Sequence, residues 1–297
     1  MASFKPFFHF ILVCFINFVT TTKAWDDDSF SMYCNDDYNK TTLNSVFQLN
    51  LKTLLSYLSS NASANKEFYS AKVADKNNSS NTVYGLFMCK GDVPAQLCSQ
   101  CVTNTIGYNS SSTSHPAGCS MSNEVDIRKK DCMVRYSNNS FFSIAGLSSP
   151  SSSCSLVNVF NPTKFTLLAI KTMNKVADEA ANFSIGFKKY ATKEATISEF
   201  QTLYFQAQCR PDLSPQGCRK CLSSTIAAFQ TCDMPSKVGK SEDYNCYIRY
   251  DVSLSIALVM LQHHHNSFQL PTIQLIQITH NILLIFPTTV QLQAMKP

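Results

Sequence analysis

A cysteine pattern occurs twice in this chain of 297 residues. A shift of 120 positions places Cys34, Cys89, Cys98 and Cys101 on Cys154, Cys209, Cys218 and Cys221. After a small gap, Cys119 falls on Cys232, and Cys132 in "CMVRY" falls on Cys246 in "CYIRY". Four coincidences at one shift indicate an internal repeat. Each repeat unit holds six cysteines and is long enough to form a domain.

The first 24 residues are typical of a secretory signal peptide. Lys5 precedes an apolar stretch of about 13 residues, shorter than the roughly 20 that a membrane-spanning helix needs, and Thr22 and Ala24 fit a cleavage site. Cleavage before Trp25 removes Cys14 and leaves 12 cysteines, an even number that favours disulfides. Sequons for N-glycosylation, which the secretory route permits, lie at Asn39, Asn61, Asn77, Asn78, Asn109, Asn138 and Asn182. We therefore expect a secreted glycoprotein.

The Cys-x-x-Cys pair of each unit, Cys98 and Cys101 or Cys218 and Cys221, admits three interpretations. A zinc site would need a second pair of Cys or His at comparable spacing, and the remaining cysteines stand alone. A redox dithiol is disfavoured because eight further cysteines surround the two pairs. A disulfide scaffold uses all twelve, although the spacing does not choose among the pairings.

Apolar residues at helical spacing predict one helix near the start of each unit, after Thr41 and Thr42 in the first, which can cap it. The two stripes are Leu43, Phe47, Leu51, Leu54, Leu55 and Leu58, and Phe165, Ala169, Met173, Val176, Ala177 and Ala180. A second helix is expected from Pro94, and from Ser214 and Pro215 in the repeat. The segments "VYGLFMC", "EVDIRKKDCMVRYS", "LYFQAQC" and "YNCYIRYDVSL" predict strands, since they are rich in aromatic and β-branched residues. An α+β fold follows for each unit.

The chain is expected to comprise a signal peptide (1–24), a first cysteine-rich domain (25–137), an exposed linker (138–153), a second cysteine-rich domain (154–252) and a disordered tail (253–297). The tail is uncharged up to Lys296. Its apolar run Leu254–Leu261 is too short to span a membrane. The histidines at 263–265 could bind a metal as a tract. Because they stand alone in a polar break of the tail, we expect no metal-binding role for them.

The tandem Cys-x8-Cys-x2-Cys spacing, with "YGLFMCKGD" before it and "CMVRY" after it, resembles the plant cysteine-rich repeat secretory proteins. These proteins are built from ginkbilobin-like antifungal domains, which also form the ectodomains of cysteine-rich receptor-like kinases. The likeness covers residues 33–251 and implies that each domain is two helices packed on a five-stranded antiparallel sheet. It also implies the disulfides Cys34–Cys119, Cys89–Cys98, Cys101–Cys132, Cys154–Cys232, Cys209–Cys218 and Cys221–Cys246.

The resemblance further implies a carbohydrate site, because the family binds mannose through an Asn after the first cysteine, a base six residues before the last cysteine and an acid five residues after it. The matching positions are Asn35, Asp126 and Ser137 in the first domain, and Ser155, Lys240 and Asp251 in the second. Neither domain keeps the full set. Arg128 could replace the missing base after a shift of two residues, which preserves its face of the strand. The alternative is that these are solvated polar positions without a ligand.

These features favour a secreted plant protein of the apoplast that binds a cell-wall or fungal glycan in defence, and the resemblance implies an antifungal role. A membrane-associated or cell-junction module that contacts extracellular proteins is the alternative, with the tail as the route to the membrane. No nucleic-acid partner is expected, because no Lys/Arg-rich run occurs. The sequence has no nucleophile elbow, metal-ligand set or glycine-rich phosphate loop, so we expect no catalytic residues, metal or cofactor.

Overall fold

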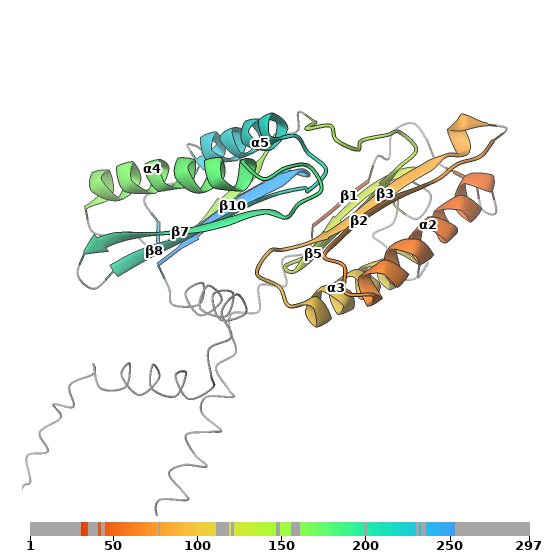
Figure 1. Cartoon of the computed structure of the whole chain (residues 1–297), viewed down its shortest axis with the longest axis horizontal. Coiled ribbons are helices and arrows are strands. Elements are labelled where there is room, and N and C mark those ends of the chain that lie inside the picture. Colours follow the sequence, from red (N-terminus) through yellow and green to blue (C-terminus); the bar gives the residue numbers. More distant parts are fainter. Residues whose placement is uncertain are drawn as a thin grey trace, which may run out of the picture. The chain divides into compact units, whose positions relative to one another are not determined.

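The computed structural model describes residues 31–34, 41–42, 45–76, 78–110, 119, 122–146, 149–155, 161–198, 201–229, 232 and 236–252. The chain divides into two compact units after Gly146. Each unit combines two α-helices with a five-stranded antiparallel sheet, which confirms the predicted α+β fold (Figure 1). The expected signal peptide, Asn35 and the tail 253–297 lie outside the described residues.

The first unit has the strand order β1-β4-β5-β3-β2. Its elements are β1 (Ser31–Cys34), α2 (Val46–Ser63), β2 (Phe68–Val73), the short 3₁₀-helix η1 (Ser79–Asn81), β3 (Val83–Cys89), α3 (Ala95–Ser110), β4 (Glu124–Arg128) and β5 (Cys132–Ser137). The central strand β5 pairs with β3, so that Cys132 lies opposite Cys89, and with β4, so that Arg135 lies opposite Asp126. The register places every second residue of β5 on the same face of the sheet.

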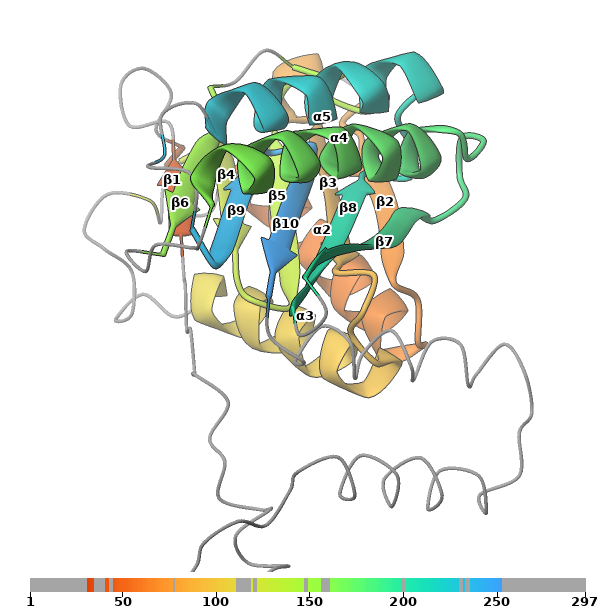
Figure 2. The same ribbon diagram turned by 90° about the vertical axis from the view of Figure 1, so that its left-hand side faces the viewer.

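The second unit repeats this topology with the strand order β6-β9-β10-β8-β7. Its elements are β6 (Ser151–Cys154), α4 (Pro162–Ala181), β7 (Lys189–Ser198), β8 (Gln201–Cys209), α5 (Pro215–Ala228), β9 (Val238–Glu242) and β10 (Cys246–Asp251). Helices α4 and α5 lie together over one face of this sheet (Figure 2). Among the residues described for each unit, the two helices lie on one face of the sheet and none lies on the other, which we call the open face.

The helix-covered face of the first sheet builds the core of that unit. The α2 residues recurring at helical spacing meet the inward-facing residues of β3, β4 and β5. The largest of them are Phe47, Leu51, Leu54, Leu55, Leu58, Val83, Phe87, Val125, Ile127, Val134 and Tyr136. Leu54 and Leu58 are fully buried, and complete burial of such a side chain stabilises the fold by about 1.5 to 3 kcal/mol. The predicted apolar stripe is therefore core, apart from Leu43, which is not described.

The core of the second unit is centred on Tyr250 of β10, which is fully buried. Its ring centroid lies 5.9 Å from that of Phe165, 6.0 Å from that of Phe205 and 5.6 Å from that of Phe229. The Tyr250 hydroxyl lies 2.9 Å from Ser236 Oγ. A phenol buried among aromatic rings needs such a polar partner, so this contact fixes the position of β10 beneath both helices.

The segment after β5 departs from the predicted linker. Phe141 is buried against Leu86, Met88 and Met133 on the open face of the first sheet. The Arg135 guanidinium lies 4.3 Å from the centre of the Phe141 ring, at cation–π distance. At the other end of the segment, residues 151–153 already belong to β6. The Ser-rich composition of 138–153 concealed both features, because one aromatic pair and a short edge strand hardly change the average composition.

Helix starts were predicted well in the second unit and less well in the first. Ser214 caps α5 by accepting a hydrogen bond from the Gly217 amide at 3.0 Å, and Pro215 is the first helical residue. In the first unit, Ser45 rather than Thr41 or Thr42 caps α2, with its hydroxyl accepting from the Gln48 amide at 3.3 Å. The Thr41 hydroxyl accepts from the side chain of Gln48 instead. The prediction of a Thr cap was therefore wrong by one helical turn.

Six disulfides join twelve cysteines, three within each unit. The pairs are Cys34–Cys119, Cys89–Cys98, Cys101–Cys132, Cys154–Cys232, Cys209–Cys218 and Cys221–Cys246, those implied by the family resemblance. Cys98 and Cys101 leave one face of α3 to reach β3 and β5, with Cα–Cα distances of 5.6 and 6.0 Å. The Cys-x-x-Cys pair thus fastens a helix to two adjacent strands.

Within the described ranges, no helix is both long and apolar enough to cross a membrane.

Candidate functional site

Alternation of side chains along the strands decides on which face of the sheet the described candidate residues lie. Cys132, Val134 and Tyr136 of β5 point into the helix-covered core, so Ser137 lies on the open face. Asp126 lies opposite Arg135, which is on that same face. In the second unit, Lys240 and Asp251 occupy the open face by the same alternation, and Ser155 directly follows β6. The sixth position, Asn35, lies outside the described residues.

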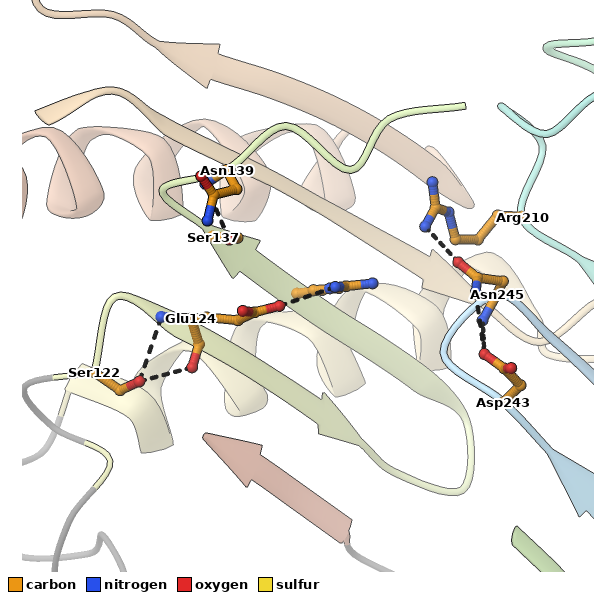
Figure 3. A network of polar contacts seen from close by, with 8 residues as sticks. Ser122, Glu124, Ser137, Asn139, Arg210, Asp243 and Asn245 are labelled. Carbon is orange, nitrogen blue, oxygen red and sulfur yellow. Dashed lines mark hydrogen bonds and ion pairs between the residues drawn. The ribbon is translucent and has the colours of Figure 1, made fainter. Parts of the chain in front are cut away.

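In the first unit the candidate residues are engaged in polar contacts on their own sheet. Arg128 Nε lies 3.1 Å from Asp126 Oδ1. The Ser137 hydroxyl accepts a hydrogen bond from the Asn139 amide at 3.1 Å (Figure 3). Both Asp126 and Ser137 are only 2% exposed. They are therefore buried rather than solvated, and Arg128 is occupied as the partner of Asp126.

A second ion pair on the open face of the first unit joins β5 to β4. Arg135 Nη2 lies 3.0 Å from Glu124 Oε1. The Ser122 hydroxyl donates to the Glu124 carbonyl at 2.8 Å and fixes the start of β4 (Figure 3). Arg135 of β5 thus lies opposite Asp126 and pairs with Glu124, and such opposite charges on neighbouring strands stabilise their pairing. The first unit uses its polar open-face residues largely to hold its own sheet together.

In the second unit, backbone pairing brings the three candidate positions close together. The Ser155 amide donates to the Val238 carbonyl at 2.9 Å, and the Ser155 hydroxyl accepts from the Val238 amide at 3.2 Å. Val238 lies directly opposite Asp251 in the sheet. Lys240 follows two residues later on the same strand face. The three positions therefore fall within two adjacent rows of one sheet face, although β6 is distant in sequence from the β9–β10 hairpin.

The charges of this group differ from those of the first unit. Lys240 lies opposite Arg249, so two cations face each other where the first unit pairs Asp126 with Arg135. Lys240 Nζ lies 3.1 Å from Glu242 Oε2, and Arg249 Nη2 lies 3.9 Å from Asp251 Oδ2. Each cation is thus balanced along its own strand. The Lys240 side chain remains 23% exposed.

The chemistry of this group suits hydroxyl-rich ligands. An ammonium group donates hydrogen bonds, a carboxylate accepts them and a serine hydroxyl does both, so the three can match the mixed character of sugar hydroxyls. Among the described residues, no group of three His, Cys, Asp or Glu side chains is arranged to hold a metal ion.

Three neighbours of this group were not recognised in the sequence: Tyr204, Gln206 and Gln208 of β8. Gln206 lies opposite Arg249, and Tyr204 lies opposite Asp251. Burial, and then the charge of Glu194, raise the pKa of the Tyr204 hydroxyl, which favours the neutral phenol. The alternation in "LYFQAQC" was the available signal, because its polar residues occupy every second position.

A separate polar network holds the turn between β8 and α5. Arg210 is fully buried and donates from Nε and Nη2 to the Asp212 carboxylate at 2.9 and 2.6 Å. Its Nη1 donates to Asn245 Oδ1 at 2.7 Å, and Asn245 Nδ2 donates to Asp243 Oδ1 at 3.0 Å (Figure 3). This network ties the turn to the β9–β10 hairpin and is a structural feature, not part of the candidate site.

Comparison with known proteins agrees with this architecture. A profile of the family described as "Salt stress response/antifungal" matches residues 33–139 and 153–253. In Arabidopsis thaliana, cysteine-rich receptor-like protein kinase 8 is 34% identical over 236 residues, which cover 76% of this chain and 32% of the kinase. "Probable cysteine-rich repeat secretory protein 6" from the same plant is 31% identical over 218 residues, covering 70% of this chain and 75% of that protein. The chain thus spans about a third of the receptor kinase.

Two solved Arabidopsis thaliana structures share the fold. The tandem DUF26 ectodomain of the cysteine-rich receptor-like protein PDLP8 superimposes with a TM-score of 0.59 at 24% identity, covering 75% of this chain and 96% of that one. The corresponding ectodomain of PDLP5 gives a TM-score of 0.58 at 25% identity, covering 75% and 98%. Both consist of two such domains in tandem. The chain therefore belongs to the salt stress response/antifungal family and carries two of its domains in tandem.

Proposed function

We propose that this protein is a secreted, apoplastic binding protein that recognises mannose-type glycans of a cell wall or fungal surface, in a defence-related and antifungal role. The observation that carries the proposal is the group formed by Ser155, Lys240 and Asp251. Pairing of β6, β9 and β10 assembles a hydroxyl, an amine and a carboxylate on one sheet face. Lys240, with 23% of its side chain exposed, is the member through which a ligand first makes contact.

Recognition is assigned to the second domain because the first lacks this combination. Asp126 and Ser137 are only 2% exposed and are held by Arg128 and Asn139. In the second domain Asp251 is also buried, at 6%, but Ser155 and Lys240 are partly exposed. A sugar would have to displace these contacts and would leave buried polar atoms unpaired, at a cost of about 1 to 3 kcal/mol each. The proposal involves binding alone, with no catalytic residue, metal or cofactor.

A glycan array with the secreted full chain tests this function. The wild-type protein should bind mannose-type glycans, and Asp251→Ala should weaken that binding. Asn35→Ala tests whether the first domain contributes. Glu194→Gln, on the edge strand β7 of the same sheet, is the matched control and should bind as wild type. Binding that survives both Asn35→Ala and Asp251→Ala would refute the site, and absence of glycan binding would refute carbohydrate recognition.

Contact with extracellular proteins at a membrane or cell junction is a second candidate function. The similarity to a receptor kinase and to the ectodomains of PDLP8 and PDLP5 supports it. Fractionation of leaf tissue separates the two candidates. Recovery of the protein in apoplastic wash fluid without detergent favours the free binding protein, whereas extraction that requires detergent favours the membrane-associated module.

A further inference from the structure

The loop between α4 and β7, residues 182–188, exposes three apolar side chains within five positions. Phe183 is 43% exposed, Ile185 is 58% exposed and Phe187 is 66% exposed. Scattered apolar residues are normal on a protein surface. Three large ones gathered in a short loop indicate that another group or molecule covers them.

The three apolar side chains stay exposed because hydrogen bonds hold the backbone of the loop in place. The Gly186 amide, at a φ of 86°, donates to the Pro211 carbonyl at 2.8 Å. The Phe187 amide donates to the Ser184 carbonyl at 3.2 Å. The buried Lys189 amine donates to the Phe183 carbonyl. These contacts fix the loop before and after its tip, so the three side chains cannot easily turn inward.

The corresponding loop of the first unit has a different character. Between α2 and β2 the chain reads Ala64, Asn65, Lys66 and Glu67, which is shorter and polar. Lys66 Nζ donates to Asn61 Oδ1 at 2.8 Å, so this loop folds back on its own helix. The apolar loop is therefore a property of the second domain and not a requirement of the shared fold.

A glycosylation sequon begins the apolar loop. Asn182, Phe183 and Ser184 form the Asn-x-Ser triplet, and Asn182 is the exposed residue that ends α4. Its amide donates to the carbonyls of Asp178 and Glu179, while its side chain makes no hydrogen bond to another described residue. The side-chain nitrogen of Asn182, to which a glycan would be attached, therefore makes no hydrogen bond to the described residues and lies beside the apolar loop.

Two of the three other sequons with described side chains, those at Asn61 and Asn78 but not Asn138, differ in this respect. Asn61 Nδ2 donates to the Tyr57 carbonyl at 2.8 Å, while Asn61 Oδ1 accepts from Lys66. Asn78 Oδ1 accepts from the Ser80 amide at 3.0 Å. A glycan on Asn61 would be attached to the nitrogen that makes one of these contacts, whereas the Asn78 contact is made by the side-chain oxygen.

We propose that Asn182 carries an N-linked glycan whose first sugars cover Phe183, Ile185 and Phe187. Transfer forms a bond between Asn182 Nδ2 and the anomeric carbon of the first sugar. The bond from that carbon to a lipid-linked diphosphate breaks, the diphosphate leaves with the electron pair, and the amide proton passes to a base. The C–H faces of the sugars then pack on the two phenyl rings, and their hydroxyls face water. This inference requires the secretory route but no glycan-binding activity.

Occupancy is measured on the full chain secreted from plant cells. A peptide N-glycosidase in water enriched in heavy oxygen converts each occupied Asn to a labelled Asp, which peptide mass spectrometry locates. Asn182 should carry the label in nearly all molecules. An unlabelled Asn182 in the secreted protein would overturn the proposal and leave the loop as a protein-docking surface.

The covering role is measured with Ser184→Ala, which removes the sequon and keeps every side chain of the apolar surface. Fluorescence of an apolar-surface dye should rise several-fold, and sedimentation should detect self-association. Glycosidase treatment of the folded wild-type protein should give the same rise. Ser80→Ala, which removes the sequon at Asn78, is the matched control and should leave both measurements unchanged.

A quadruple variant, S184A with F183S, I185S and F187S, links the effect to these side chains. Its dye fluorescence and sedimentation should return to wild-type values. If S184A and the glycosidase both leave dye fluorescence unchanged, the glycan does not cover the loop. If the quadruple variant still aggregates, the apolar surface responsible lies elsewhere.

Discussion

At the scale of single residues, Gly239 illustrates how the two domains differ within one topology. A Cβ atom at this position would lie 2.5 Å from Cζ and 2.7 Å from Oη of Tyr250. The first unit has Val125 opposite Tyr136 at the matching place. The Tyr250 ring therefore occupies space that a side chain fills in the first domain, and the second domain requires glycine there.

Gly239→Ala should destabilise the protein by about 1 to 3 kcal/mol, because the new methyl group overpacks against a ring fixed by three aromatic neighbours. Gly107→Ala is the control, since a Cβ there meets nothing within 4 Å and alanine favours the helix by about 1 kcal/mol. Thermal unfolding followed by circular dichroism should show a lower midpoint for the first variant and a slightly higher one for the second. Equal midpoints would contradict the packing of Tyr250.

Lys189 provides a prediction about pH. Burial lowers the pKa of its amine, so the charged form costs free energy in the native state. Between the lowered pKa and the usual value of 10.5, the unfolded chain binds the proton and the native protein releases it. The contribution of Lys189 to the free energy of unfolding therefore rises as the pH rises from the lowered pKa to 10.5, and it is reduced at lower pH.

Comparison with Lys189→Met isolates this effect, because the other titrating groups are common to both proteins. The free energy of unfolding of wild type relative to the variant should increase as the pH approaches 10.5. Denaturant titrations at a series of alkaline pH values measure it. A difference that stays constant with pH would show that Lys189 titrates at its ordinary pKa.

At the scale of elements, the long-range disulfides join the first strand of each sheet to the segment before the fourth. The sequence separations are 85 residues for Cys34–Cys119 and 78 for Cys154–Cys232. Loop-closure entropy depends weakly on length, so removing either pair by double alanine substitution should cost nearly the same, about 4.5 kcal/mol. Urea titration of both variants tests this. A cost well below that value, or a large difference between the units, would contradict an entropic role.

The turn between β8 and α5 gives a second prediction. Arg210→Ala removes a fully buried guanidinium and leaves Asp212 and Asn245 without their donor, so it should cost about 3 to 5 kcal/mol. Lys90→Ala, at the matching and partly exposed position of the first unit, should cost less. The urea midpoint of each variant measures the cost. Comparable losses would show that the buried network adds nothing.

The elements that sequence reasoning recovered are those with a strong period. The apolar stripe of α2 stands out because one face of the helix is buried. The aromatic run of β3 stands out because both faces of this central strand are buried. Strands β1, β6 and β9 were not recognised from the residues, since "SMYC", "SSSC" and "VGKSE" are short and rich in Ser or Gly. Their strand conformation depends on pairing with a neighbour, a tertiary effect that local propensity does not contain.

The candidate site was only partly predictable for the same reason. Family resemblance supplied the positions, and the structure assigned Asp251 to its face. Glu124 meets Arg135 across two paired strands, whereas Arg128 and Glu242 lie two residues along the strand from Asp126 and Lys240. The burial of Asp126 and the balance of charge around Lys240 depend on tertiary contacts, so they became evident only in the folded structure.

At the scale of the whole molecule, the chain is two disulfide-closed domains that share a topology and differ in their open faces. In the first, Asp126 faces Arg135 and the polar residues stabilise the sheet. In the second, Lys240 faces Arg249, pairs with Glu242 and keeps 23% of its side chain exposed. Under the proposed function, one domain keeps a scaffold role while the other presents the binding surface.

The most direct test of this account is a calorimetric titration of the secreted full chain with a short mannose oligosaccharide. The account predicts that Lys240→Met weakens binding about tenfold or more, as expected for the loss of a charged hydrogen-bond donor. Lys220→Met, which removes an exposed lysine from α5, and Asp126→Asn should bind as wild type. Unchanged affinity for Lys240→Met, or loss of binding in Asp126→Asn, would contradict recognition through the second domain.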